Sequence, residues 1–227
     1  MPPPEYVLPR DYLDNNRIKL QHHLTTELFG YLLHLDIPLQ NANLKIADIA
    51  AGTGIVLTDL SRRLPSSVYL DAELLPRNVG LYRWDIKVDV PTELEGAYDV
   101  VHVRNIVFVL SDEEIEDVLS KLLKHLNKIN GECSTAAIEE IVRITRSADP
   151  RLVPHWVPEL PRLFESVGLV DLRKDTREGP GHIDYTFHEC VLMVHDMIAR
   201  KTSNEGETFN GAFHVWTRQT VIGRKRE

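Results

Sequence analysis

The sequence predicts an α/β fold with a mostly parallel sheet, flanked by helices, and an antiparallel strand at the C-terminal end. Three observations support this prediction. A short apolar segment, 44–50, passes through a glycine turn directly into an amphipathic helix, 55–64. Further strand-like and helix-like segments alternate along most of the chain, as in α/β proteins. The final strand-like segment, 212–223, follows a loop and a helix, which fits an antiparallel closing hairpin.

The N-terminal part of the chain is expected to form an extended segment and one helix. Residues 1–13 are rich in proline, and Asp14 is placed to cap the helix that follows. Pro38 ends this helix because a proline ring cannot continue the helical hydrogen bonds. The apolar residues of the predicted helix recur at helical spacing: Ile18, Leu20, Leu24, Leu28, Leu32 and Leu35. We therefore divide the chain into an N-terminal segment, 1–40, and a main domain, 41–227.

The middle of the chain is expected to supply three more strands. Short apolar segments at 68–71, 79–84 and 98–104 have the length of buried strands. The sequence at 111–114, Ser-Asp-Glu-Glu, has the form of a capping box and precedes a helix. The apolar residues of that helix are Ile115, Val118, Leu119, Leu122, Leu123 and Leu126. The remaining predicted elements are helices at 135–146, 158–167 and 184–200 and a strand at 169–173.

Composition excludes several classes of protein. The 227 residues carry a formal net charge of −8, whereas nucleic-acid binding relies on clustered Lys and Arg. Cys133 and Cys190 lack the spacing of a zinc site or of a disulfide framework, so neither metal nor disulfide is expected. The first residues are interrupted by prolines and charges, unlike a signal peptide, and no apolar run reaches the roughly 20 residues of a membrane span. We expect a single-domain cytoplasmic protein without a nucleic-acid or membrane partner, with a nuclear location as the alternative.

The turn after the first strand carries the most specific chemical signal. Its residues are Asp48, Ala50, Gly52, Thr53 and Gly54. Glycines let the backbone approach a ligand, and the N-terminus of the next helix offers unpaired N–H groups to an anion. A carboxylate or a phosphate is therefore expected there, although two glycines also occur in purely structural turns. A dinucleotide-binding turn would have a third glycine near position 57, where this chain has Leu57, so NAD is disfavoured.

Two carboxylates at the ends of the next strands are candidates for ligand binding. Asp71 ends the second strand, about 20 residues after the glycine turn, where an acidic group can accept hydrogen bonds from ribose hydroxyls. Glu73 is an alternative ribose-binding residue. The alternative for Asp71 itself is an exposed loop residue that binds no ligand. Asp85 follows the third strand and can accept from an exocyclic adenine amine while Ile86 packs on the ring; the alternative is an Asp that starts a turn.

Several segments along the chain belong together as a pattern. They are Tyr6-Val7-Leu8-Pro9, Arg17 with Gln21-His22-His23, Asp48 to Gly54, Tyr98 to Arg104, Gly211 to Trp216 and Val221-Ile222-Gly223. In these segments, which extend over nearly the whole chain, the protein resembles the fungal small-molecule methyltransferases of secondary metabolism. The resemblance implies a class I, Rossmann-like methyltransferase sheet that uses S-adenosyl-L-methionine and acts on a small-molecule acceptor.

The resemblance also implies roles for individual residues. The implied cofactor-binding residues are Asp48, Ala50, Gly52, Thr53, Gly54, Asp71, Asp85, Ile86, Arg104 and Asn105. The N-terminal segment is implied to cover the bound cofactor, and the glycine turn to lie under its methionine part. Asp71 is implied to hold the ribose, and Asp85 with Ile86 to meet the adenine. Arg104 and Asn105 are implied to line the methyl end.

Two segments depart from the pattern of the family that the chain resembles. About seven residues separate the second and third strands, which is too few for the helix of a parallel crossover. After residues 124–127 the family pattern has a Pro-Gly-Gly turn and an apolar fifth strand, whereas residues 130–135 here lead almost directly into the next helix. The fifth strand is therefore expected to be missing or reduced to a stub. Either the last strands close up beside the fourth, or the chain is a shortened form with impaired activity.

Methyl transfer from a sulfonium is an in-line displacement, which a protein promotes by holding the acceptor close and excluding water. His155, in a proline-flanked loop, is the candidate base for removing a proton from a phenol, thiol or amide; a surface histidine is the alternative. His102, inside a valine-rich strand, is expected to be a hydrogen-bonded core residue. Either an apolar acceptor pocket or core packing accounts for Trp156, Phe164, Tyr185, Phe187 and Met193.

The function favoured by the sequence is a methyltransferase that modifies N or O of a small natural product, such as a peptide-derived metabolite. The alternatives are a methyltransferase-like regulator of secondary metabolism, which works through partner proteins, and a lapsed methyltransferase. Such regulators usually carry longer N-terminal extensions, whereas the shared pattern here begins by Tyr6. Weak or absent cofactor binding would identify a lapsed enzyme.

Overall fold

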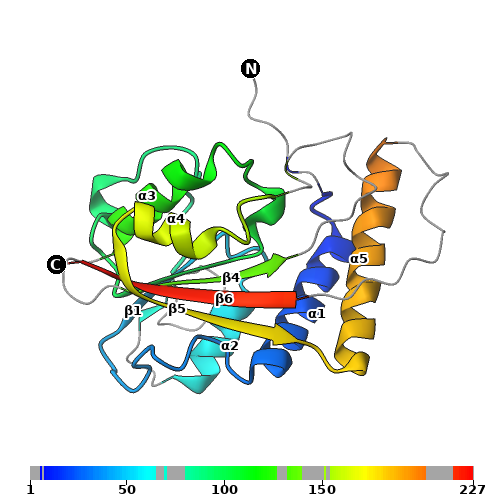
Figure 1. The fold of residues 1–227 in the computed structure, drawn as a ribbon, viewed down its shortest axis with the longest axis horizontal. Helices are drawn as coiled ribbons and strands as arrows, with labels where there is room; N and C mark the ends of the chain where they lie inside the picture. Colours follow the sequence, from blue (N-terminus) through cyan, green and yellow to red (C-terminus); the bar gives the residue numbers. More distant parts are fainter. Residues whose placement is uncertain are drawn as a thin grey trace.

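The computed structural model describes residues 6, 8–64, 69–70, 80–126, 132–139, 151, 154–202 and 217–226. In this part of the chain, six strands form one sheet in the order β2-β1-β3-β4-β6-β5 (Figure 1). The strands are β1 (Lys45–Ile49), β2 (Tyr69–Leu70), β3 (Val100–Arg104), β4 (Glu132–Glu139), β5 (Leu169–Glu178) and β6 (Thr217–Lys225). The helices are α1 (Tyr12–Phe29), α2 (Ile55–Arg63), α3 (Ile115–His125), α4 (Leu160–Ser166) and α5 (Gly181–Thr202), with short 3-10 turns η1 (Thr92–Leu94) and η2 (Ile106–Phe108).

The sheet has a parallel part and an antiparallel part. β1 pairs in parallel with both β2 and β3, and β3 pairs in parallel with β4. β6 lies between β4 and β5 and runs antiparallel to both. The predicted fold class is therefore confirmed, including the antiparallel C-terminal strand. The predicted elements at 158–167, 169–173 and 184–200 correspond to α4, β5 and α5, and the described part of the predicted strand at 212–223 corresponds to β6.

The prediction that the fifth strand is missing or a stub is wrong. β4 has eight residues: all eight pair with β6 on one side, and the first five, 132–136, also pair with β3 on the other. The helix predicted at 135–146 is wrong for residues 135–139, which belong to this strand; the rest of that segment lies outside the described residues. Alanine and glutamate favour a helix locally, but two neighbouring strands offer the backbone a complete ladder of hydrogen bonds, so pairing overrides local propensity.

The strand predicted at 79–84 is also wrong where the structure describes it. Residues 80–84 are irregular, and the described residues between β2 and β3 contain η1 but no strand. A turn follows at 85–88, where the backbone N–H of Val88 donates to the carbonyl oxygen of Asp85, and the indole of Trp84 donates across it to the carbonyl oxygen of Asp89 at 3.1 Å.

The two faces of the sheet are covered by different helices. Successive side chains of a strand point to opposite faces. On one face, Ala47, Val101 and Val103 share the main core with buried residues of α3 and α4. On the other, Ile46 and Val100 pack with buried residues of α2. Helices therefore flank the sheet on both sides.

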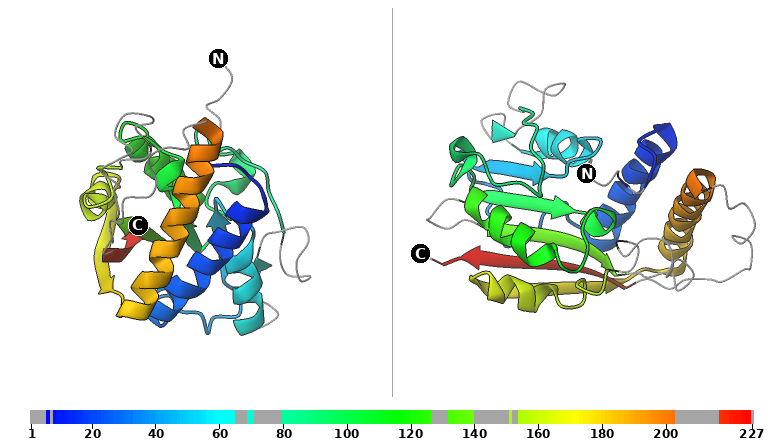
Figure 2. Two further views of the ribbon diagram at one scale, coloured as in Figure 1. Left: turned by 90° about the vertical axis from the view of Figure 1, so that its right-hand side faces the viewer. Right: turned by 90° about the horizontal axis from the view of Figure 1, so that it is seen from above.

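α1 and α5 lie side by side across the end of the sheet at which the parallel strands finish (Figure 2). Leu24 of α1 packs with Ile183, Phe187 and Cys190 of α5. This helix pair covers the carboxyl ends of the strands, which is where ligands bind in open parallel sheets. Among the helices in the described ranges, none combines the length and apolar character needed to cross a membrane.

α1 differs from its prediction at both ends. Asp11, not Asp14, is the N-cap, because its side chain accepts hydrogen bonds from the backbone N–H groups of Leu13 and Asp14. The helix ends at Phe29, since Gly30 adopts a left-handed conformation with φ of 74°. The turns of 31–43 follow, so the apolar residues of this region belong to a loop and not to a longer helix.

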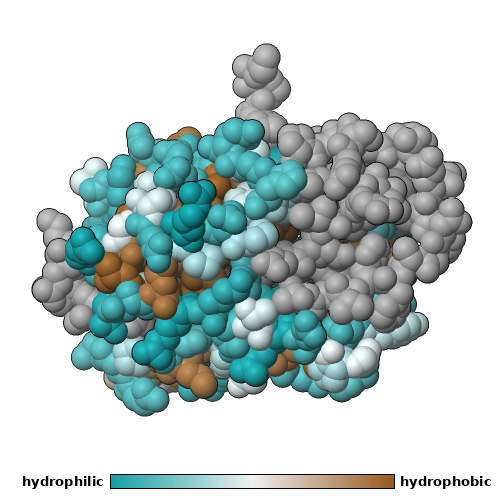
Figure 3. All heavy atoms as spheres, in the orientation of Figure 1, coloured by the Kyte–Doolittle hydropathy of each residue, from teal (hydrophilic) through white to brown (hydrophobic). Residues whose placement is uncertain are grey.

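β5 lies at one end of the sheet, beside β6. Its charged residues are Asp171, Arg173, Lys174, Asp175, Arg177 and Glu178. Figure 3 shows that hydrophilic side chains also cover much of the face seen in Figure 1, with smaller groups of apolar residues between them.

Candidate functional site

The corner between β1 and α2 has an unusual backbone. Ala50, Gly52 and Gly54 all have positive φ, at 58°, 58° and 69°. Glycine adopts this conformation freely, whereas Ala50 does so at a cost, and such strained residues concentrate at functional sites. The backbone N–H of Gly54 donates to the carbonyl oxygen of Ala51 at 2.9 Å, which closes the turn. The predicted strand–turn–helix corner is confirmed.

The N-terminus of α2 is free of side-chain caps and is covered by α1. Gly54 is its N-cap and has no side chain with which to bond the first amides. The first N–H groups of a helix have no partner within the helix and carry partial positive charge. A Cβ atom on Gly52 would lie 3.6 Å from Cδ1 of Ile18, so α1 lies directly over the corner.

The side chain of Asp48 is buried near the end of β1, and only one of its two carboxylate oxygens has a hydrogen-bond partner in the part of the chain that the structure describes. Its Oδ1 lies 2.7 Å from Nδ1 of His102 on the neighbouring strand β3, and both side chains are 3% exposed. This confirms the expectation that His102 is a hydrogen-bonded core residue. Oδ2 of Asp48 is buried and has no hydrogen-bond partner among the described residues.

Arg104 ends β3 and connects the sheet to α1 and α2. Its Nη2 lies 3.0 Å from Nδ1 of His22 on α1, and Nε2 of His22 lies 3.1 Å from Oδ2 of Asp59 on α2. A guanidinium can only donate, so Nδ1 of His22 accepts and Nε2 carries the proton that bonds Asp59. Burial lowers the pKa of His22, and the positive charge of Arg104 lowers it further. Burial also lowers the pKa of Arg104, while Asp48 acts in the opposite direction.

Asn105 and Thr53 add two more unpartnered polar atoms. Asn105 follows β3 directly and has a φ of 59°, in the left-handed region that asparagine adopts more readily than other non-glycine residues. Its Oδ1 is buried without a hydrogen-bond partner in the described structure, and so is Oγ1 of Thr53 in the glycine turn. Buried polar groups in proteins are nearly always hydrogen-bonded, so each exception calls for an explanation. With Oδ2 of Asp48, three such atoms lie at or just after the carboxyl ends of β1 and β3.

The remaining predicted cofactor residues are Asp71, which the structure does not describe, and Asp85 and Ile86, which lie between β2 and β3. Asp71, with its alternative Glu73, lies outside the described residues; β2, which ends immediately before Asp71, pairs in parallel with β1. Asp85 starts a turn in which its Oδ1 accepts from the backbone N–H of Lys87 at 3.0 Å. Ile86 is buried in the main core.

His155 lies on the surface and is held by one carboxylate. Its side chain is 72% exposed. Asp112 accepts a hydrogen bond from the backbone N–H of His155 at 2.9 Å, and its second oxygen lies 2.8 Å from Nδ1 of the ring. Sequence reasoning missed Asp112 as a partner because 43 residues separate it from His155. The oxygen beside the ring favours the tautomer with the proton on Nδ1, which leaves Nε2 as the basic nitrogen.

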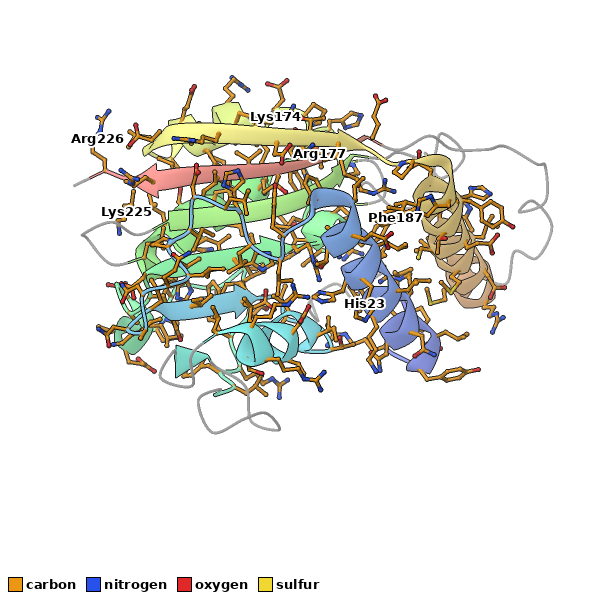
Figure 4. All side chains as sticks on the ribbon, turned by 90° about the horizontal axis from the view of Figure 1, so that it is seen from below. His23, Lys174, Arg177, Phe187, Lys225 and Arg226 are labelled. Atoms are coloured by element: carbon orange, nitrogen blue, oxygen red, sulfur yellow. The ribbon has the colours of Figure 1, made fainter. Side chains whose placement is uncertain are left out.

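The residues considered for an apolar pocket do not form one. Trp156 and Phe164 belong to the main core, whereas Phe187 belongs to the cluster between α1 and α5, and Tyr185 is exposed. Figure 4 shows Phe187 on α5, where Arg218 of β6 lies over its ring with the guanidinium carbon 3.3 Å from the centroid. A cavity of about 10 Å³, room for one water molecule, lies between α1 and the sheet. Its lining includes Thr25, His102, Arg104 and Thr220.

Comparison with curated proteins finds three related sequences. The chain is 22% identical to the N-methyltransferase gliN of Aspergillus fumigatus over 77% of this chain and 71% of the relative. It is 28% identical to the N-methyltransferase verN of Clonostachys rogersoniana over 52% of this chain and 45% of the relative. The chain is thus similar in sequence to fungal proteins named as methyltransferases. The third relative, the methyltransferase grgD of a Penicillium species, is 29% identical over 53% of this chain and 48% of its own length.

The chain thus spans about half the length of two of these curated relatives. No protein-family model matches it.

Solved structures show which fold the chain shares. The S-adenosylmethionine-dependent methyltransferase SibL has a TM-score of 0.55 and 13% identity, covering 91% of this chain and 56% of SibL. Phosphoethanolamine N-methyltransferase 2 of Haemonchus contortus, in complex with S-adenosyl-L-methionine, has a TM-score of 0.55 and 9% identity over 94% and 53%. The [4+2]-cyclase SpnF has a TM-score of 0.52 and 12% identity over 93% and 94%. The fold is therefore that of Rossmann-like methyltransferases, and function has to be argued from the site.

Proposed function

We propose that the chain is an S-adenosylmethionine-dependent methyltransferase that transfers a methyl group to N or O of a small natural product in secondary metabolism. The observation that carries the proposal is the set of three buried, unpartnered oxygens at the carboxyl ends of β1 and β3: Asp48 Oδ2, Thr53 Oγ1 and Asn105 Oδ1. A bound polar ligand would give these atoms partners. The names of the three fungal relatives support the same reading.

The residues present fit S-adenosylmethionine. Its α-carboxylate suits the uncapped N-terminus of α2, where N–H groups point outward. Its ammonium group is a donor without acceptor capacity, which suits the free oxygens of Asp48 and Asn105. Asp71 would receive the ribose hydroxyls and Asp85 the adenine amine. When bound, this cofactor supplies an electrophilic methyl group on a positively charged sulfur.

The chain promotes such a transfer by positioning and by excluding water. α1, with Ile18 over Gly52, and its neighbour α5 cover the carboxyl ends of the strands. We assign His155 as the base for an acceptor that must lose a proton. Nδ1–H of His155 donates to Asp112, and Nε2 takes the proton from the acceptor as the new bond to the methyl group forms.

The proposal is tested by calorimetric titration with S-adenosylmethionine and S-adenosylhomocysteine. The unmodified protein should bind both. Asn105→Ala and Asp71→Ala should each weaken binding about tenfold, because each removes a hydrogen-bond partner of a buried ligand group. Asn16→Ala, on the exposed side of α1, is the matched control and should bind as the unmodified protein does. Equal affinity in all four proteins would reject the assigned site.

A lapsed methyltransferase is the second candidate. The intact β4 removes one of the two reasons for it; the other, a connection after the second strand too short for a crossover helix, falls on residues 71–79, outside the described ranges. If the folded protein binds neither S-adenosylmethionine nor S-adenosylhomocysteine, the lapsed form replaces the first proposal.

A further inference from the structure

Lys121 is a charged residue on the buried side of α3. Its side chain is 10% exposed and lies on a helix whose other buried residues are mostly apolar. Its Nζ donates to the carbonyl oxygen of Lys87 at 2.8 Å and to Oδ2 of Asp117 at 2.6 Å. Desolvating an ammonium is costly, and an apolar residue of similar size is often neutral or stabilising in such a place. Packing alone therefore gives no reason for a lysine here.

A second contact joins the loop that contains Lys87 to the N-terminal end of α3, and here the loop residue is the donor. Nζ of Lys87 donates to Oε1 of Glu114 at 2.7 Å, and Oε2 of Glu114 accepts from the backbone N–H of Ser111 at 2.9 Å. Burial alone would raise the pKa of Glu114, but the hydrogen bonds from Lys87 and Ser111 hold that pKa below its usual value. Glu114 is therefore charged at neutral pH and holds the Lys87 side chain in place.

The turn held by these contacts presents Asp85. The backbone N–H of Lys87 donates to Asp85 Oδ1 and that of Val88 donates to the Asp85 carbonyl oxygen, each at 3.0 Å. Ile86 anchors the turn in the main core. Asp85 itself is exposed, and within the described ranges its Oδ2 has no hydrogen bond. One oxygen thus maintains the turn and the other remains open to a donor.

We propose that Lys121 is a positioning residue that aims the open oxygen of Asp85 at an exocyclic amine, and so determines selectivity for adenine over a base without that amine. The inference rests on the proposed function, because it takes the adenine of S-adenosylmethionine as the ligand. Lys121 touches the Lys87 carbonyl and not the ligand, so it acts through the turn. The recognition is selective because a base with an oxygen in place of the amine would present an acceptor to the carboxylate of Asp85, and two acceptors cannot form a hydrogen bond.

The test compares S-adenosylhomocysteine with S-inosylhomocysteine, in which an oxygen replaces the adenine amine. By calorimetry, the unmodified protein should prefer the adenosyl ligand about tenfold, the ratio that one discriminating hydrogen bond gives. Lys121→Met should reduce this ratio to near one by weakening the adenosyl ligand alone, with the inosyl ligand unchanged. Lys124→Met, an exposed lysine on the same helix, is the matched control and should keep the full ratio.

A double-mutant cycle separates positioning from a general loss of structure. If Lys121 acts through Asp85, then Lys121→Met should have no further effect in an Asp85→Asn background. Loss of affinity for both ligands in equal proportion, or an unchanged ratio in Lys121→Met, would overturn the inference. If the unmodified protein binds neither ligand, the failure is that of the proposed function.

Discussion

Two Asp–His pairs of this protein share a geometry but have opposite surroundings. Asp48 and His102 are joined at 2.7 Å through Nδ1, and Asp112 and His155 at 2.8 Å through the same ring atom. The first pair is 3% exposed on both sides, whereas the His155 side chain is 72% exposed. The buried pair joins two strands and is shielded from water. The exposed pair leaves Nε2 accessible, so the same hydrogen bond serves packing in one place and is open to chemistry in the other.

Removing the buried histidine should have the largest effect. His102→Leu leaves the buried carboxylate of Asp48 without a hydrogen bond to either oxygen, and the free energy of unfolding should fall by about 3 kcal/mol. Urea denaturation measures this change. His155→Leu is the counterpart and should change stability by no more than about 0.5 kcal/mol. Equal losses in the two variants would contradict the contrast between the pairs.

The exposed pair should affect the rate instead of stability. His155→Ala should lower methyl transfer to a phenol or amide acceptor about a hundredfold, the usual contribution of a general base. The release of S-adenosylhomocysteine in the presence of a panel of such acceptors measures the rate. Asp112→Asn should give a smaller loss, because the ring keeps a hydrogen-bond partner but loses a negative charge. A pH–rate profile unchanged in both variants would remove His155 from the mechanism.

A third histidine should make stability depend on pH. Burial and Arg104 lower the pKa of His22 below its ordinary value of 6.5, so the unfolded chain binds a proton more readily than the folded one. The stability that neutral His22 provides is therefore present above pH 6.5 and is lost as the pH falls through and below that value. The slope should approach about 1.4 kcal/mol per pH unit.

Denaturation curves between neutral and mildly acidic pH check this prediction. His22→Gln should flatten the dependence, since an amide can accept from Arg104 and donate to Asp59 without titrating. His23→Gln, at the exposed neighbouring position labelled in Figure 4, should change it little, because the charge of His23 has the smallest of the effects on the pKa of His22. The buried His125, whose pKa burial also lowers, contributes a residual slope in both variants. If the stability of His22→Gln depended on pH more steeply than that of the unmodified protein, His22 would not be the source of the pH dependence.

The sequence was most informative where local chemistry and topology agree. The glycine turn predicts its own backbone, because Gly52 and Gly54 suit left-handed conformations that the structure contains. The periodic leucines of α3 likewise predict a helix with one buried face. β4 could not be predicted in this way, since its residues favour a helix and only the neighbouring β3 and β6 make a strand of them.

The candidate site was predictable only in part. Residues at the carboxyl ends of strands can be found from the sequence by their position after an apolar segment: Asp48 lies near the end of β1 and Asn105 directly follows β3. The contacts between His22, Arg104 and Asp59 join residues 37 and 82 positions apart, and no local signal links them. The turn at Asp85 was an open alternative, and the structure contains both the turn and a free oxygen.

The outer strand β5 carries a consequence for behaviour in concentrated solution. An edge strand exposes backbone groups that can pair with a strand of another molecule and start aggregation. Here six of the ten residues of β5 are charged, among them Lys174 and Arg177 in Figure 4. A foreign strand added along β5 would have to strip water from these charges without providing partners for them. The molecule is thereby protected from sheet-to-sheet growth at the edge where its ladder of backbone bonds ends.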